Sequence, residues 1–378
     1  MNKSLILVSL ASCLFGASQT MILGLIPFMS KALNLPLAIV VSIYGLSILI
    51  YLIFTLWWGK FIPEIGVKKS LLAGTGGLAL SNGALLFSIY STSAGGMLFI
   101  ASRLIHAIGA SSIIPLSQGL RAQIHGSEAG GLLSHSLWLS VGRFSGLVLG
   151  LIFYTNITTL LLITILCSMI LNLCICFWSV SVEQIKAQQP ETSNAISLIY
   201  FQPLLFMSVI AYFNTSLSKT VSYFEKVVVL QTKALYLGLL VIAFFILLFQ
   251  IILKKTTLYR VAIINFIAYL SLVGSAYFFH RIEDLNSLIL FILLVSFAAA
   301  LIPLDYSVKI FSQQRKGETL ISGKISFYQT LGNALGAMLA GAALSFDRMS
   351  SNLILLFAFT VLCGHIYLTI NKKKKVFV

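Results

Sequence analysis

The feature that most constrains the fold of this chain is a succession of long apolar stretches. A helix needs about 20 mostly apolar residues to cross the hydrocarbon core of a bilayer. None of the stretches alternates polar and apolar residues, so they predict membrane-spanning helices and not the strands of a barrel. We count twelve, at residues 5–29, 36–58, 70–91, 96–117, 131–154, 158–178, 198–218, 234–253, 261–279, 287–311, 321–344 and 353–370. The sequence therefore predicts an all-α membrane protein with twelve transmembrane helices.

Composition agrees with this interpretation, because 58% of the 378 residues are hydrophobic and only 9% are charged. The net charge of +15 does not indicate a nucleic-acid partner, since the basic residues are scattered between apolar stretches instead of gathering on one soluble face. The five cysteines lie inside apolar stretches, which is typical of small packing residues. Leu10-Ala-Ser-Cys13 is like a lipoprotein cleavage box, but the apolar stretch continues to Met29 and favours a first transmembrane helix.

A polar stretch in the middle of the chain divides the spans into two sets of six. Residues 181–197, SVEQIKAQQPETSNAIS, form this linker, so we predict six-helix bundles at residues 1–180 and 198–378. Two motifs recur in the same order in both halves, which is typical of transporters built from related bundles. They are Ile114-Pro-Leu-Ser117 with Ile302-Pro-Leu-Asp305, and Gly142, Gly146 and Gly150 with Gly332, Gly336 and Ala340.

Lysine and arginine residues set the expected orientation, since cytoplasmic loops carry an excess of both. With a cytoplasmic N-terminus, seventeen basic residues fall on the cytoplasmic side and five on the other. The run Lys372–Lys375 belongs to the larger group, and we expect it to contact anionic membrane lipid. Both termini and the linker are therefore predicted to be cytoplasmic.

Twelve spans in two sets of six with a polar linker resemble the major facilitator superfamily over the whole chain. In the loop after span two, Gly59, Gly66 and Lys68 match the superfamily's gating motif. Pro63 and Glu64 stand where that motif has an acid and a basic residue. The resemblance implies gating roles for Gly59, Gly66 and Lys68. It also implies secondary transport by alternating access, in which two bundles rock about a central site.

Spans four and five carry two further resemblances. The stretch Arg103-Leu-Ile-His106-Ala-Ile-Gly109 is similar to the superfamily's arginine-containing motif. The glycines of span five are similar to a motif associated with exporters, with Leu147 where a proline is usual. The second resemblance implies efflux by an antiporter.

Arg143 is a permanent charge in the middle of span five. It lies about 100° around the helix from Gly142 and joins Ser136 and Ser140 in a polar stripe. At 1.5 Å per residue it is about 18 Å from the inner end of its span. A charge at that depth costs several kcal/mol unless it faces a cavity or a partner. Two interpretations follow: a substrate anchor that faces a central cavity, or a structural arginine bonded to backbone carbonyls.

Three other ionisable residues lie deep in the spans. Arg103 and His106 are one turn apart in span four, where roles in coupling or substrate contact compete with structural hydrogen bonding. Asp305 is the only carboxylate well inside a span, and Lys309 four residues on offers an intrahelical ion pair as the alternative to a proton or gating role.

Neutral polar and aromatic residues complete the predicted site. Spans one, four, seven and ten line the cavity in the superfamily's fold, with contributions from two, five, eight and eleven. Asn82 and Asn172, on spans three and six, are therefore expected to be packing groups. The resemblance implies as lining residues, besides Arg143, Gln19, Asn214, Gln329, Asn333, Tyr44 and Tyr51.

The function predicted from these features is secondary active transport and not an enzymatic reaction. The chain has no phosphate-binding loop, no paired carboxylates, no metal-ligand helix and no nucleophile elbow, so we expect no cofactor and no metal. An electropositive cavity favours an anionic or carboxylate-bearing substrate such as an organic anion, a siderophore or a drug. We expect a monomer in the bacterial inner membrane that exports this molecule. The alternatives are proton-coupled uptake of a metabolite or metal chelate, a membrane-embedded enzyme, and a non-transporting receptor.

Overall fold

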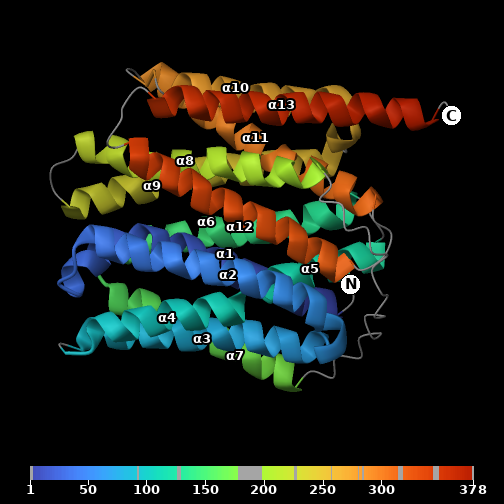
Figure 1. The fold of residues 1–378 in the computed structure, drawn as a ribbon. Helices are drawn as coiled ribbons and strands as arrows, with labels where there is room; N and C mark the ends of the chain where they lie inside the picture. The colour runs from blue at the N-terminus through green and yellow to red at the C-terminus, as the bar shows by residue number, and fades with distance from the viewer. Residues whose placement is uncertain are drawn as a thin grey trace.

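The computed structural model describes residues 3–91, 93–125, 129–177, 198–224, 228–256, 258–279, 281–282, 285–313, 318–343 and 349–376. The predicted linker, residues 181–197, lies outside them. Long helices lie side by side along one direction, and α1 begins at the same end of the bundle where α13 ends (Figure 1). Each of the twelve predicted spans overlaps helical residues, so the predicted all-α fold with twelve transmembrane helices is confirmed.

The helices follow the order of the predicted spans. Those of the first half are α1 (Lys3–Ala32), α2 (Leu37–Ile65), α3 (Val67–Tyr90), α4 (Gly95–Ala110), α5 (Ile113–His125), α6 (Ala129–Ile152) and α7 (Ile157–Phe177). Those of the second half are η1 (Leu198–Tyr200), α8 (Phe201–Phe224), α9 (Val228–Thr256), η2 (Leu258–Arg260), α10 (Ala262–Phe279), α11 (Leu285–Gln313), α12 (Glu318–Ala343) and α13 (Met349–Val376).

Ten helical segments of the described residues, with α4 and α5 counted as one, are long and apolar enough to cross a membrane. The helices α8 and α12 are not among the ten, and the position of α12 explains its composition. It packs against α8 of its own half and against α2 and α5 of the other half. A helix surrounded by protein on several sides does not need the apolar surface that lipid demands.

Span four is longer than predicted and is interrupted. The sequence predicted one helix over residues 96–117, whereas α4 ends at Ala110 and α5 continues to His125. The interruption at residues 111–112 precedes Pro115, which has no N–H to give to the carbonyl of Ser111 and whose ring crowds that carbonyl. The matching Pro303 of the second half lies inside an unbroken α11.

The two halves use the same helix pairings. In the first half α1 packs along α6, and in the second half α8 packs along α12. Gly142 and Gly146 face the backbone carbonyls of Cys13 and Ala17 in α1, so close that a Cβ at either position would overlap them. Gly332 and Gly336 face the carbonyls of α8 in the same way. The predicted packing role of these glycines is confirmed.

Candidate functional site

A cluster of polar side chains lies where helices from both halves meet. We call it the central polar cluster; it comprises Tyr51 of α2, Arg143 of α6, Tyr306 of α11, and Ser326 and Gln329 of α12. Gln329 Nε2 donates a hydrogen bond of 2.5 Å to the Tyr306 hydroxyl, and the Tyr51 side chain is hydrogen-bonded to Ser326. Arg143 is within electrostatic range of both tyrosines. The cluster thus gathers side chains from α2 and α6 of the first half and from α11 and α12 of the second half. Arg143 supplies its only charge.

Buried phenylalanines hold the two tyrosines from behind. The ring of Phe15 in α1 stacks on Tyr51 at 6.0 Å between centroids, and the ring of Phe206 in α8 tilts against Tyr306 at 6.2 Å. Both phenylalanines are almost completely buried. Because both supporting rings are buried, the tyrosines present their hydroxyl groups to the interface from rigid supports.

The guanidinium of Arg143 makes no hydrogen bond or ion pair with any described residue, and the side chain keeps partial exposure. The described residues include three acids. Glu64 lies at the end of α2, Glu318 begins α12, and the carboxylate of Asp305 is engaged by other groups. The backbone of Arg143 is held in place, since its carbonyl accepts a hydrogen bond of 2.9 Å from Thr20. The structure therefore ties the backbone of α6 to α1 at Arg143 and leaves the guanidinium of this residue unpaired among the described residues.

The other predicted lining residues are Gln19, Tyr44, Asn214 and Asn333. Gln19 and Asn333 are partly exposed and Asn214 is exposed. None of these three side chains makes a hydrogen bond to the cluster within the part of the chain that the structure describes. Tyr44, two turns before Tyr51 on α2, lies near Arg103 of α4 instead of Arg143. Of the predicted set, the structure brings together Tyr51, Arg143 and Gln329.

Arg103 and His106 lie within the first half. Arg103 is 2% exposed, and its guanidinium donates to the hydroxyl of Ser102 at 3.0 and 3.3 Å. The ring of His106 stacks on Phe15 at 6.2 Å between centroids, with its Nδ1 buried and without a hydrogen-bond partner among the described residues. His106 therefore adjoins the central polar cluster through Phe15, and Arg103 is farther out along α4.

The predicted gating residues lie at the end of the bundle where α1 begins. Gly66, between α2 and α3, has a φ of +89°, a backbone conformation that residues other than glycine rarely adopt. Lys68 donates to the carbonyl of Cys176 in α7 at 3.0 Å and so ties the loop to its own half. Gly59 is in contact with the other half, because a Cβ added to it would lie 3.0 Å from the Cα of Gly323 in α12.

Further contacts close this end of the interface between the halves. The Ser322 hydroxyl of α12 donates to Gln118 of α5 at 2.7 Å, and both side chains are buried. Gly119 of α5 packs on Thr319 of α12, where a Cβ would lie 2.8 Å from the Thr319 Cα. We call the contact of Gly59, Gln118 and Gly119 with α12 the inner gate. It leaves no room for a molecule to pass between α2, α5 and α12.

Opposite the inner gate, Tyr236 of α9 joins the halves. Its ring fits against Gly24 of α1 and Gly150 of α6, where a Cβ would overlap it. Its hydroxyl donates a hydrogen bond of 2.8 Å to the carbonyl of Met21. The halves therefore also touch beyond the central polar cluster, through one fully buried side chain.

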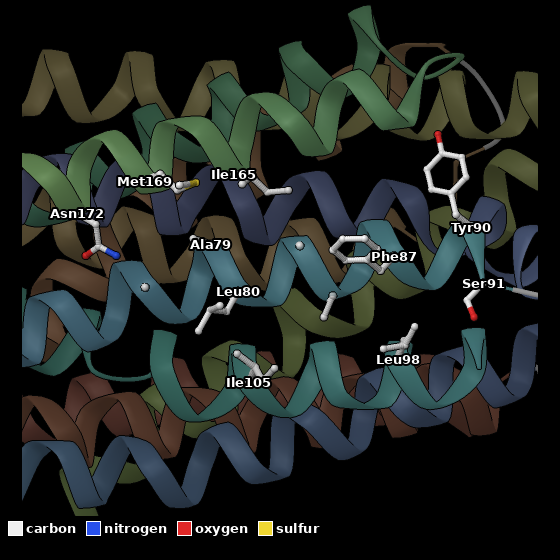
Figure 2. A pocket seen from close by; sticks show the side chains of 13 residues that line it. Ala79, Leu80, Phe87, Tyr90, Ser91, Leu98, Ile105, Ile165, Met169 and Asn172 are labelled. Carbon is white, nitrogen blue, oxygen red and sulfur yellow. The ribbon is translucent and has the colours of Figure 1, made fainter. Parts of the chain in front are cut away.

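A groove of about 1030 Å³ lies away from this interface, between α3, α4 and α7 (Figure 2). Its lining residues include Leu80, Phe87 and Met169, and none of the residues that line it is charged. The predicted packing role of Asn172 is confirmed, since this groove residue accepts a hydrogen bond of 2.7 Å from Thr75. The groove offers no counter-charge to an anion.

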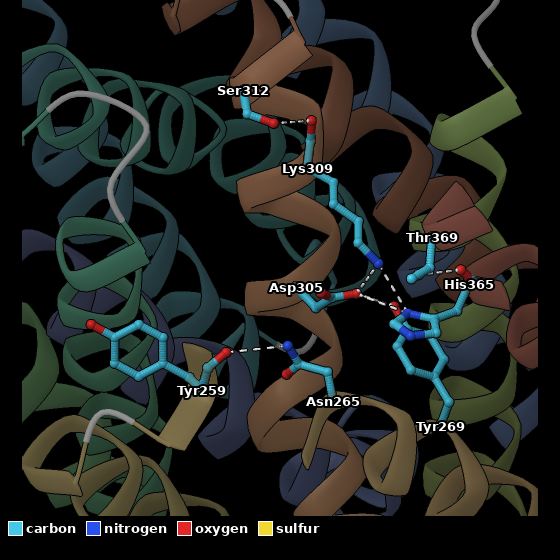
Figure 3. Close-up of polar contacts among 8 residues, drawn as sticks. All are labelled: Tyr259, Asn265, Tyr269, Asp305, Lys309, Ser312, His365 and Thr369. Atoms are coloured by element: carbon cyan, nitrogen blue, oxygen red, sulfur yellow. Dashed lines mark hydrogen bonds and ion pairs between the residues drawn. The ribbon is translucent and has the colours of Figure 1, made fainter. Parts of the chain in front are cut away.

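Asp305 faces away from the central polar cluster. Figure 3 shows it pointing from α11 toward α10 and α13, where its Oδ2 accepts hydrogen bonds from Tyr269 at 2.8 Å and from Lys309 at 2.7 Å. His365 Nδ1 lies 3.2 Å from the same oxygen. The intrahelical ion pair with Lys309 that the sequence suggested is present, and two residues from other helices extend it.

A family model of the major facilitator superfamily matches residues 8–373. The chain belongs to the major facilitator superfamily. Among solved structures, the human organic anion transporter MFSD10 (TETRAN) is similar over 96% of this chain and 98% of that one, with a TM-score of 0.73 and 18% sequence identity. A mutant of the nucleoside transporter NupG is similar over 97% and 99%, with a TM-score of 0.63 and 12% identity. No curated protein sequence matches the chain.

Membership of the superfamily makes this chain a multi-pass membrane transporter, as the sequence predicted. At identities below 25%, the two solved structures show the fold alone. The residues that sequence reasoning missed are Tyr306, Ser326, Tyr269 and His365. Tyr306 directly follows Asp305 in the repeated motif, and His365 is an ionisable residue inside span twelve, so both carried a signal. Ser326 and Tyr269 are ordinary residues of apolar helices, and only their neighbours in space distinguish them.

Proposed function

We propose that this transporter binds an anionic, carboxylate-bearing small molecule at the central polar cluster and moves it by alternating access. The observation that supports this is the guanidinium of Arg143, which has no partner among the described residues and belongs to a partly exposed residue at mid-membrane depth. Leaving a cation without a partner in that position costs several kcal/mol. A ligand that supplies the missing anion recovers part of that cost when it binds.

The chemistry of the cluster suits a carboxylate. The guanidinium offers a planar fork of donors that matches two carboxylate oxygens. The hydroxyl groups of Tyr51 and Tyr306 and the hydroxyl of Ser326 add neutral donors without adding a competing negative charge. Carboxylate-bearing organic anions, siderophores and drugs present this group. That the similar structure MFSD10 is named an organic anion transporter agrees with the proposal, and the nucleoside transporter NupG marks the competing, uncharged substrate class.

Binding of anions in preference to uncharged molecules is directly measurable. Proteoliposomes that contain the purified protein are loaded with a radiolabelled mono- or dicarboxylate or with a radiolabelled nucleoside. Exchange of the internal label against the same unlabelled compound outside is then followed. We expect exchange with at least one carboxylate and none with the nucleoside. Exchange of the nucleoside alone would contradict the proposed substrate class.

The direction and the setting of transport remain the ones proposed from the sequence: efflux across the bacterial inner membrane, with both termini and the linker cytoplasmic. The excess of basic residues on one side supports the orientation, and the span-five glycines support efflux. Residues 1–180 and 198–378 are proposed as the two bundles that rock against each other. Proton-coupled uptake is the alternative direction.

Alternating access requires the inner gate to open. Gly59→Val should hold it open, because the added side chain cannot fit against Gly323 and Thr319. The reporter is Ser322→Cys, which is isosteric and fully buried at the gate, in a variant whose five native cysteines are replaced. An impermeant thiol reagent should label this cysteine in inside-out vesicles, faster with Gly59→Val than without it.

The same experiment reports the orientation. Glu64→Cys, exposed at the end of α2, is the control that should react in inside-out vesicles in either background. Equal labelling of Ser322→Cys with and without Gly59→Val would contradict the gate. Labelling of Glu64→Cys in intact cells would contradict the cytoplasmic placement of this end.

A further inference from the structure

A second buried arginine lies in the first half, towards the end of the bundle where α1 begins. Arg121 of α5 is 4% exposed. Its Nη1 donates a hydrogen bond of 2.9 Å to the hydroxyl of Ser134 in α6, and its Nη2 donates to the hydroxyl of Ser9 in α1. Its Nε is buried and has no hydrogen-bond partner among the described residues. Arg121 is therefore held between three helices by groups that carry no charge.

The charge of Arg121 is balanced by none of the described acids. The ion pairs of the described residues involve only Asp305, with Lys309 and His365. A guanidinium stays protonated in proteins, so loss of a proton cannot relieve its burial. Hydroxyl groups accept its hydrogen bonds but supply no opposite charge, and a buried cation in this condition is costly. A bound anion would supply the missing charge.

A histidine beside Arg121 has a second unpaired nitrogen. His135 of α6 is 3% exposed and lies within electrostatic range of Arg121. Its Nδ1 is 2.7 Å from the hydroxyl of Ser117, to which Ser12 donates a hydrogen bond of 2.9 Å. Its Nε2 is buried and has no partner among the described residues. When Ser117 passes its own hydrogen to Nδ1, the neutral ring carries its proton on Nε2 and offers a second N–H donor.

Two unpaired N–H groups and one uncompensated positive charge thus occur together between α1, α5 and α6. Folded proteins rarely leave buried donors unpaired, and a bound water or ion is a usual explanation. Water would accept the hydrogen bonds but would leave the charge unbalanced. An acceptor with a negative charge satisfies both needs, and the hydroxyls of Ser9 and Ser134 can turn their hydrogens toward it.

The place of these groups next to the inner gate gives an anion a way in. Gln118 lies one turn before Arg121 on α5, and it accepts the hydrogen bond of Ser322 that closes the gate. Opening of the gate moves α12 away from α5 at this point. Along α6, His135 precedes Arg143 by eight residues, or roughly 12 Å, and it lies within electrostatic range of both arginines.

We propose that Arg121 and His135 form a second anion site, which we call the Arg121 site. It takes one small monoanion that accepts hydrogen bonds, either chloride or the carboxylate group of a small organic acid. Two nitrogens of this guanidinium are already bonded to hydroxyls, so fewer donors remain than Arg143 offers and the anion binds more weakly. Use of the Arg121 site by the transported molecule rests on the proposed function, whereas binding of chloride does not.

The test measures chloride binding in a protein that lacks the guanidinium of Arg143. Binding broadens the ³⁵Cl NMR line of sodium chloride, and this broadening is followed as the purified Arg143→Ala variant is added in detergent. We expect broadening by Arg143→Ala. Adding Arg121→Gln to it should reduce the broadening about tenfold, because glutamine keeps hydrogen-bonding groups but removes the charge.

Three companion variants of Arg143→Ala keep the result interpretable. Lys69→Gln is the matched control, since it removes an exposed positive charge at the start of α3 and should leave the broadening unchanged. His135→Leu removes the second donor and should weaken binding by a smaller factor than Arg121→Gln, which it replaces should that variant fail to fold. Gly59→Val holds the inner gate open, so a closed gate cannot hide the site.

Competition with acetate distinguishes the two sources of the anion. Acetate that reduces the broadening shows that carboxylate groups enter the Arg121 site, and broadening that acetate leaves intact assigns the site to chloride. Equal broadening with and without Arg121, or none in Arg143→Ala even with Gly59→Val, would overturn the proposal. Loss of chloride binding in Arg121→Gln, together with a carboxylate affinity that does not depend on Arg143, would leave this site standing and contradict the proposed function.

Discussion

Replacing Arg143 with alanine is expected to abolish binding of the carboxylate that the exchange assay selects. The guanidinium is the only charge in the central polar cluster, and no described residue neutralises it. Removing one partner of a buried, hydrogen-bonded charge pair costs about 2–5 kcal/mol, so affinity should fall by about thirtyfold or more. Calorimetry on the purified, monodisperse variant measures this loss directly.

Lysine should substitute poorly at this position. Its ammonium group retains the charge but has no planar fork, so Arg143→Lys should show an affinity between those of the wild type and Arg143→Ala. Arg281→Gln is the matched control, because it removes one exposed positive charge at the start of the loop after α10 and should leave affinity unchanged.

The competing interpretation of Arg143 makes the opposite prediction. A structural arginine would be needed for folding, so Arg143→Ala would lower yield and melting temperature while affinity per folded molecule stayed near the wild-type value. The absence of a hydrogen bond from this guanidinium to any described residue argues against that outcome. Wild-type affinity in Arg143→Ala would contradict the proposal that Arg143 binds the substrate.

Much of the fold was predictable from the sequence because the bilayer restricts the choices. Apolar length gave the twelve spans, and spacing of four residues gave the face on which Gly142 and Gly146 pack. Helical phase separated Arg143 from that face. The break before Pro115 was not predicted. The equivalent Pro303 lies in a continuous helix, so the presence of a proline does not by itself indicate a break. A proline removes one hydrogen bond in either case, and the neighbouring helices decide whether the chain bends, kinks or breaks.

The site was predictable only in part, because partners across helices leave no trace in spacing. The sequence placed Arg143, Tyr51 and Gln329 among the lining residues, and the structure brings these three together. It did not indicate that Asp305 turns toward Tyr269 and His365, since those residues are 36 and 60 positions away.

The two halves are alike in packing and unlike in charge. Arg143 of α6 corresponds to Asn333 of α12, so the anchor belongs to the first bundle alone. The buried contacts of Asp305 with Tyr269, Lys309 and His365 belong to the second bundle alone. Within the central polar cluster the halves meet where Tyr51 of α2 is hydrogen-bonded to Ser326 of α12 and where Arg143 of α6 lies within electrostatic range of Tyr306 of α11.

The close packing of α6 on α1 predicts the largest effect on folding. Gly142→Ala should strongly destabilise the protein, because the added Cβ would overlap the backbone carbonyl of Cys13, which cannot move without displacing α1. Overpacking of a well-packed interior costs about 1–3 kcal/mol, and a contact with backbone lies at the upper end of that range. Gly332→Ala should have the same effect in the second half, where the Cβ would overlap the Leu204 carbonyl.

Gly45→Ala is the matched control for these two variants. It is also a helical glycine within a span, but a Cβ at Gly45 meets no atom within 4 Å. Alanine is the better helix former, so the melting temperature of Gly45→Ala should equal or exceed that of the wild type. Monodispersity on size exclusion and thermal melting in detergent compare the three. A melting temperature of Gly142→Ala as high as that of Gly45→Ala would mean that α1 and α6 can separate at no cost, which would remove the rigid support proposed for Arg143.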